Sequence, residues 1–147
     1  MDDLQKYALE QPPGVHAFFA LVETTADLIA ASERYWQSHD LNGARIRILV
    51  EIAKAGGSLL PSALAERIGV TKANISVLLV PLASEDLVRI DDDPNDGRKR
   101  RVTLAAAGER LLRDKLPGNR EVIGRRMDRL SEAETRQLLD LLAKLRE

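Results

Sequence analysis

Apolar residues recur at helical spacing in three short stretches near the middle of the chain, with polar residues between them. Asn42 and Thr71 are suitable N-caps for the first and third stretches, and Pro61 suits the first position of the second. Gly69 can supply the positive φ that a tight turn between the last two stretches requires. The pattern predicts a helix-turn-helix in the second and third of these helices. The expected helices span residues 43–55, 61–68 and 72 to about 85.

Longer helical patterns flank this segment. The first runs over residues 15–39, and its apolar stripe is Val15, Phe18, Phe19, Val22, Ala26, Ile29 and Trp36. A second is expected over residues 105–129, where Pro117 and Gly118 should kink or break it. Ser131 and Glu134 form a capping box that opens a last helix. These stripes would expose a large apolar surface on a monomer, so we expect a homodimer that persists at micromolar concentration.

Two short strands, 87–90 and 99–104, are expected around a turn at residues 94–97. Three aspartates, Asp91–Asp93, precede this turn, and the basic run Arg98–Arg101 follows it. Charge can simply protect an edge strand from pairing. That explanation does not account for a basic run directly after a helix-turn-helix. The position therefore favours a hairpin wing that contacts phosphates or the minor groove.

The composition excludes several classes of function without identifying the function itself. The 147 residues carry a net charge of only −1, so attraction to nucleic acid must come from local charge placement. The absence of cysteine excludes thiol catalysis and thiolate metal sites. His16 and His39 are too far apart for a transition-metal site, and the run Asp91–Asp93 lacks the ligand spacing of a calcium loop. No nucleophile elbow, metal motif or phosphate loop is present. We expect neither an enzyme nor a bound cofactor.

The beginning of the chain carries no targeting pattern. Its first residues are acidic, without the basic and then apolar sequence of a signal peptide. No apolar run is expected to reach the ~20 residues that cross a bilayer. These observations predict a cytoplasmic protein with no membrane partner.

The motifs together resemble those of the MarR family of transcriptional regulators. The wing sequence from Asp93 to Arg98, followed by Val102-Thr103-Leu104 and Gly108, is similar to that family's wing, and "LNGARIRIL" and "SALAERIGV" are similar to its second and third helices. The resemblance implies a mainly α fold with a small β-hairpin wing: a winged helix-turn-helix with N- and C-terminal dimerisation helices. One domain would span residues 1–147, with dimerisation helices at 15–39 and 105–147 and a DNA-binding lobe at 42–104.

The resemblance also implies which residues contact double-stranded DNA. Arg98 would enter the minor groove, held by Asp96, and the other Asp side chains of the wing would orient its basic groups. Asn74 could pair with adenine, and Ala73 or Val77 could touch a thymine methyl group. The expected DNA-binding residues are Thr71, Lys72, Ala73, Asn74, Ser76, Val77, Asp96, Arg98, Lys99 and Arg100.

The helix at 72–85 departs from the family pattern. Lys72 is the only charged residue on its expected outer face, where relatives carry more polar and basic groups. Pro81 predicts a kink or an early stop, and Asp86 stands where the family usually has glycine.

Two functions therefore stay open. The first is a sequence-specific homodimeric regulator, expected to be a repressor, that reads a pseudo-palindromic operator. The alternative is a winged-helix protein-interaction module with weak or non-specific DNA binding.

A small amphipathic or aromatic effector is the remaining expected partner. The resemblance implies a crevice for such molecules between the dimerisation helices and the DNA-binding lobe. The residues expected in that region are Tyr35, Trp36, Arg45 and Arg47.

Overall fold

The computed structural model describes residues 2–147, which form two compact units. Unit 2 is the continuous segment Tyr35–Glu121. Unit 1 combines the residues before it, up to Arg34, with the residues after it, Val122–Glu147. Helices α2 and α6 each contribute one end to unit 1 and the other end to unit 2.

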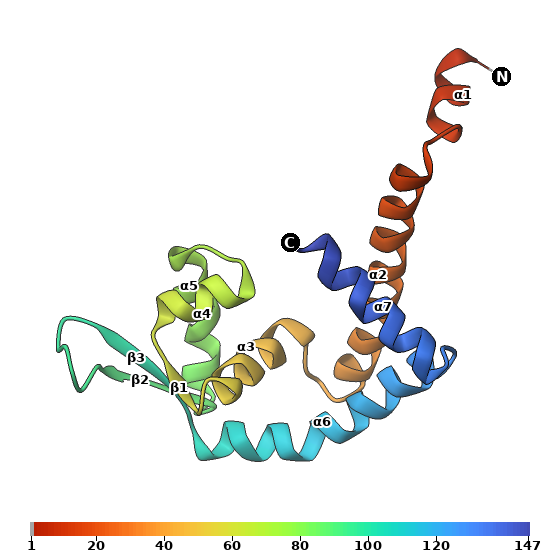
Figure 1. Cartoon of the computed structure of the whole chain (residues 1–147). Helices are drawn as coiled ribbons and strands as arrows, with labels where there is room; N and C mark the ends of the chain where they lie inside the picture. Colours follow the sequence, from red (N-terminus) through yellow and green to blue (C-terminus); the bar gives the residue numbers. More distant parts are fainter. Residues whose placement is uncertain (1) are drawn as a thin grey trace. The chain divides into compact units, whose positions relative to one another are not determined.

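Unit 2 contains a helical cluster beside a small sheet (Figure 1). Its helices are α3 (Gly43–Lys54), α4 (Pro61–Ile68), α5 (Lys72–Ser84) and the first part of α6 (Ala106–Met127). The three-stranded antiparallel sheet has the order β1-β3-β2. Its strands are β1 (Ser58–Leu59), β2 (Val88–Asp92) and β3 (Arg100–Leu104).

All the buried apolar side chains of the described chain belong to unit 2. Leu49, Ile52, Leu64, Ile75 and Leu82 are fully buried, which places the inner faces of α3, α4 and α5 around one core. The sheet closes this core, since Val88 of β2 and Val102 of β3 are also buried. The apolar faces of the helices expected over residues 43–55 and 72–85 therefore point into this core.

Local signals set most helix ends. Asn42 Oδ1 accepts a hydrogen bond from Arg45 N at 2.9 Å, so Asn42 caps α3 as predicted. Gly69 has φ 82° and ends α4 in the left-handed conformation. Ser131 and Glu134 form the predicted capping box of α7 (Glu132–Leu145). A polar group that satisfies an orphan N–H stabilises a helix start by about 1 kcal/mol through contacts only a few residues apart.

Unit 1 contains α1 (Asp3–Leu9), most of α2 (Pro13–Ser38), the end of α6 and α7. None of its described residues is buried. The stripe expected on the first long helix is exposed: Phe18 by 59%, Val22 by 50% and Ile29 by 60%. Only Trp36, at the end of α2 that belongs to unit 2, is buried. The apolar surface of these helices is therefore uncovered in a single chain.

The early stop at Pro81 and the break at Pro117, which the sequence offered as alternatives to a kink, do not occur. Helix α5 continues three residues past Pro81 and ends at Ser84, so Pro81 does not stop it early. Helix α6 runs unbroken through Pro117 and Gly118. In each helix, buried side chains on both sides of the proline hold the backbone in place: Leu79 and Leu82 in α5, Leu112 and Asn119 in α6. The patterns also gave no indication of α1 or of the two-residue strand β1.

The expectation that no apolar run is long enough to cross a bilayer was also wrong. Helix α2 is long enough and apolar enough to cross a membrane by those two criteria, and no part of the qualifying window is buried. Charged residues are sparse along it; the apolar stripe and many small neutral residues raise its hydropathy together.

Candidate nucleic-acid interface

Helices α4 and α5 are joined by a short turn at residues 69–71. Val70 N donates to the Ala65 carbonyl at 3.0 Å and Gly69 N donates to the same oxygen at 2.8 Å. Thr71 caps α5, because its Oγ1 accepts from Asn74 N at 3.1 Å. The buried side chains of Leu64, Ala65 and Ile75 then fix α5 against α4. This is the predicted helix-turn-helix, and it leaves one side of α5 open.

The open side of α5 is poor in charge. Lys72, Ala73, Asn74 and Ser76 are exposed, and so is Val77, by 70%. Further along the helix, Val80 is exposed by 64%. The Ser76 hydroxyl donates back to the Lys72 carbonyl at 3.2 Å. Lys72 and the Asn74 amide are therefore the main polar groups that this face offers.

The neck of the β2–β3 hairpin is held by Asp93. Its Oδ1 accepts from Asn95 N at 2.7 Å and from Asp96 N at 3.3 Å, and its Oδ2 pairs with Arg101 Nη1 at 3.4 Å. The hydrogen bond from Asn95 N lowers the pKa of the Asp93 carboxyl most, and the Asp96 N–H and Arg101 lower the pKa further. The charged carboxylate thus organises the turn.

Arg101 belongs to this neck, and its side chain is 36% exposed, against 95% for Arg98. Its Nε donates to Ser58 Oγ at 2.8 Å and its Nη2 to the Ser58 carbonyl at 3.4 Å. One guanidinium therefore ties β3 to β1 and to the Asp93 turn. In the sequence, Arg101 belongs to the basic run of the wing, and nothing there identifies Ser58 or Asp93 as its partner.

The tip of the hairpin carries the remaining cations. Asp96 Oδ1 accepts from Arg98 N at 3.1 Å and lies 3.5 Å from Arg98 Nε. The Arg98 side chain is nevertheless 95% exposed. Lys99 and Arg100 are exposed, and neither has an ion-pair partner among residues 2–147. Asp91 and Asp92 lie opposite Arg101 and Arg100 in the strand register.

The structure thus brings the expected contact residues into two groups within unit 2. One group, Thr71–Asn74 with Ser76 and Val77, lies on the first turns of α5. The other, Asp96 with Arg98–Arg100, lies at the tip of the β2–β3 hairpin. All these residues except Asp96 are exposed, and the Asp96 side chain is 37% exposed.

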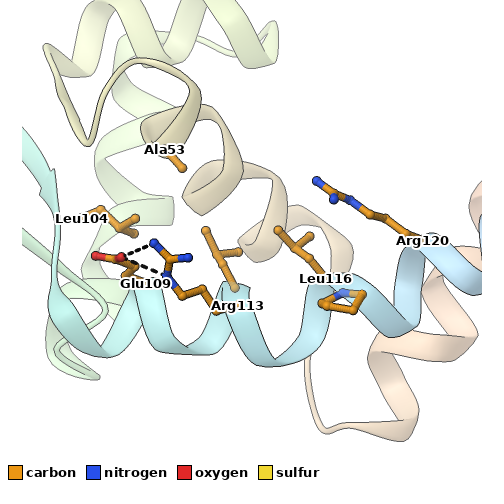
Figure 2. Close-up of a pocket in the computed structure, with 8 residues that line it drawn as sticks. Ala53, Leu104, Glu109, Arg113, Leu116 and Arg120 are labelled. Atoms are coloured by element: carbon orange, nitrogen blue, oxygen red, sulfur yellow. Dashed lines mark hydrogen bonds and ion pairs between the residues drawn. The ribbon is translucent and has the colours of Figure 1, made fainter.

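An open groove of about 570 Å³ lies between α3, the end of β3 and α6 (Figure 2). Its apolar lining is Ala53, Leu104, Leu112, Leu116 and Pro117, and its charged lining is Glu109, Arg113 and Arg120. Glu109 and Arg113 pair with each other at 2.8 Å. Arg120 stands at the other end of the groove from that pair. The sequence feature that belongs to this site is the seven-residue spacing of Arg113 and Arg120 along one helix.

The four residues expected near an effector do not line this groove. Trp36 is buried in the core, with 3% of its surface exposed. The Tyr35 hydroxyl donates to the Lys115 carbonyl at 2.7 Å, and Arg45 pairs with Glu85 at 3.1 Å. Arg47 donates to the Arg67 carbonyl at 3.3 Å. Each of the four side chains has a structural role in unit 2.

The helix-turn-helix followed by a charged antiparallel hairpin defines a winged helix-turn-helix protein. Comparison with known proteins agrees. A family model described as "MarR family" matches residues 39–99. The chain is 32% identical over 112 residues to the transcriptional regulator HosA of Escherichia coli, covering 75% of this chain and 82% of HosA. It is 28% identical over 142 residues to the transcriptional repressor YetL of Bacillus subtilis, covering 96% of this chain and 85% of YetL.

A solved structure extends the agreement to the fold. The MarR family regulator Sco3205 of Streptomyces coelicolor, determined in complex with DNA, superimposes with a TM-score of 0.80 at 22% identity. The match covers 89% of this chain and 84% of that one. The chain belongs to the MarR family of transcriptional regulators, and the resemblance noted in the sequence is confirmed.

Proposed function

We propose that this regulator is a homodimeric repressor that binds a pseudo-palindromic operator through α5 and the β2–β3 wing, and that a small amphipathic ligand releases it. The observation that carries the proposal is the exposed cation cluster Arg98–Arg100 on a braced hairpin next in sequence to a helix-turn-helix. Cations at the wing supply phosphate or minor-groove contact, and a helix inserted in the major groove supplies base contact.

The first test is fluorescence anisotropy with labelled duplexes from the region upstream of the protein's own gene, at two salt concentrations. We expect saturable binding that prefers one duplex and weakens steeply with salt. The logarithm of the affinity should fall by about 0.9 per neutralised phosphate for each unit of log salt concentration. Equal, weak binding to every duplex would instead favour the protein-interaction module, for which the exposed Val77 and Val80 are the supporting feature.

The wing is tested by Arg98→Ala, with Arg110→Ala as the matched control. Arg110 is another exposed arginine of unit 2, on α6 and without an ion-pair partner in the described chain. Removal of Arg98 should weaken binding and reduce the salt slope by about one phosphate equivalent. The control should change neither. Identical isotherms for both variants would remove the wing from the interface.

Dimerisation is supported by the uncovered surface of unit 1. Phe18, Phe19, Val22 and Ile29 on α2 and Leu139, Leu141 and Leu145 on α7 are all exposed by more than a third. Apolar surface of this extent on one unit is typical of an interface that a second copy covers. A two-fold dimer would present two α5 helices to half-sites one helical turn apart, about 34 Å.

Sedimentation velocity at micromolar concentration tests this arrangement. Wild type should sediment as a dimer, and Val22→Asp should shift it toward monomer because a charge would be buried in the interface. Glu23→Gln, the adjacent exposed position on the same helix, is the control and should leave the dimer intact. A monomeric wild type would leave no geometric basis for reading a palindrome.

Repression is proposed from the similarity to YetL, which is named a transcriptional repressor. A reporter gene under the control of the region upstream of the protein's own gene tests whether the protein represses or activates transcription. Deletion of the regulator should raise expression, and complementation should lower it again. A fall on deletion would make the protein an activator.

The groove of Figure 2 is the proposed effector site. Its apolar floor suits a ring or short hydrocarbon, and Arg120 has no ion-pair partner among the described residues, so it can pair with an acid group. Benzoate is a suitable probe: calorimetry should detect binding that Arg120→Gln weakens and Arg110→Gln does not. Binding of benzoate should also reduce the affinity for DNA, because an effector acts only through different affinities for the two states. An unchanged isotherm for Arg120→Gln would move the effector site elsewhere.

A further inference from the structure

The open face of α5 offers unusually few polar groups for base recognition. The Ser76 hydroxyl is engaged by the Lys72 carbonyl, and the Thr71 hydroxyl accepts from Asn74 N. The Asn74 amide has no hydrogen-bond partner among residues 2–147. Near the middle of this face stands Val77, an apolar side chain that is 70% exposed. Among the four bases, only thymine presents a methyl group in the major groove.

We propose that Val77 is a specificity-determining residue that recognises a thymine methyl group in each half-site, close to an adenine recognised by Asn74. This inference rests on the proposed DNA-binding function and specifies the base sequence that the function requires.

The helical geometry supports the pairing of these two residues. Asn74 and Val77 are three positions apart and therefore lie on the same side of the helix. Three residues correspond to about 4.5 Å along the axis, and successive base pairs are about 3.4 Å apart. The adenine and the thymine should then lie within about two base-pair steps of each other. The first turns of a recognition helix are the part that contacts base edges, and both residues lie there.

Val80 is the natural comparison on the same helix. It is exposed to nearly the same extent as Val77, 64% against 70%, and its side chain is identical. It lies one turn closer to the C-terminus, beyond the part of a recognition helix that usually reaches base edges. Val77→Ala and Val80→Ala should therefore have similar effects on folding and different effects on base recognition.

The experiment begins with selection of a preferred sequence from random duplexes by the wild-type full chain. Each thymine of a selected half-site is then replaced by deoxyuridine, which removes only the 5-methyl group. At one thymine per half-site, wild type should bind about four-fold more weakly, the loss that one buried methyl group predicts. Val77→Ala should bind the thymine and deoxyuridine duplexes equally at that position, whereas Val80→Ala should keep the wild-type difference.

The outcomes separate the two levels of the proposal. A selected sequence whose affinity never depends on a thymine methyl group overturns the assignment of Val77 and leaves the regulator function intact. Loss of the difference in Val80→Ala, with retention in Val77→Ala, overturns it as well. If no sequence is selected at all, the proposed function fails and this inference fails with it.

Discussion

Units 1 and 2 are both mainly helical, but only unit 2 buries apolar side chains. Leu49, Ile52 and Leu64 of unit 2 are inaccessible to solvent, while Phe18, Ile29 and Leu139 of unit 1 are exposed by 59–60%. Since burial of apolar surface is the main favourable contribution to folding, unit 2 has its own source of stability. Unit 1 gains a comparable source only when its helices are covered by something else.

The difference suggests that the two units have different roles, one in presenting the contact residues and the other in assembly. The helix-turn-helix and the wing belong to the unit with a closed core, so the proposed contact residues stand on a framework that does not depend on a partner. The open helices of unit 1 can then serve assembly.

The largest expected effect compares two leucines in the middle of helices. Leu49→Ala in α3 should lower the free energy of unfolding by about 2–5 kcal/mol, because a fully buried side chain leaves a cavity. Leu139→Ala in α7, where the side chain is 60% exposed, should cost well under 1 kcal/mol in an isolated chain. Chemical denaturation at several protein concentrations measures both. A large loss for Leu139→Ala that varies with concentration would show that a second copy buries it.

The next comparison uses two glycines of α6. A Cβ on Gly108, in unit 2, would collide with the Leu87 carbonyl oxygen and lie 2.8 Å from Leu104 Cδ1, whereas a Cβ on Gly124, in unit 1, would meet open space. Gly108→Ala should cost about 1–3 kcal/mol through overpacking. Gly124→Ala should gain up to about 1 kcal/mol from helix propensity. Urea unfolding of both variants is the measurement; equal gains would contradict the tight packing of unit 2 at Gly108.

A smaller gain is expected where α5 ends. Asp86 has φ 59°, a left-handed conformation in which a side chain is unfavourable, at the position where the family usually has glycine. Asp86→Gly should stabilise the protein by up to about 1 kcal/mol. Glu85→Gly is the control: Glu85 has φ −90°, so glycine there should only lose stability. Thermal unfolding that ranks the two variants in the opposite order would rule out strain at Asp86.

The smallest effect concerns carboxylates that accept backbone hydrogen bonds, one in each unit. Backbone N–H groups lower the pKa of Asp93 in the wing of unit 2 and of Glu134 in the capping box of unit 1. A lowered pKa stabilises the fold at pH values above the unfolded pKa. That stability is lost as the pH falls through the folded pKa. The melting-temperature differences between wild type and Asp93→Asn or Glu134→Gln should therefore shrink as the pH drops below about 4.

Carboxyl carbon NMR provides the direct check. Both groups should titrate below their ordinary values of 3.8 for aspartate and 4.5 for glutamate. An Asp93 titration at or above its ordinary value would mean that the wing turn is not organised as described.

The elements that the sequence predicted well are those set by neighbouring residues. Asn42, Thr71 and Ser131 cap the helices they precede, because each needs only a backbone N–H a few positions away. The prolines were misjudged as possible helix ends for the opposite reason. Pro81 and Pro117 each remove a backbone hydrogen bond, a local penalty that packing on both sides outweighs. The strand β1 was missed because two residues carry no periodicity, and pairing with Thr103 and Val102 defines it.

The same distinction applies to the candidate site. The sequence by itself determined that Lys72, Asn74 and Val77 lie on the outer face of one helix and that Arg98–Arg100 lie on a hairpin, since spacing and turn chemistry are local properties. Only the tertiary structure decided that Arg101 is held by Ser58 and Asp93, while Lys99 and Arg100 have no ion-pair partner in the described part of the chain. It also decided that the groove lies beside Arg120. Ion pairs and cavities join residues that are distant along the chain, so their formation depends on how the core packs.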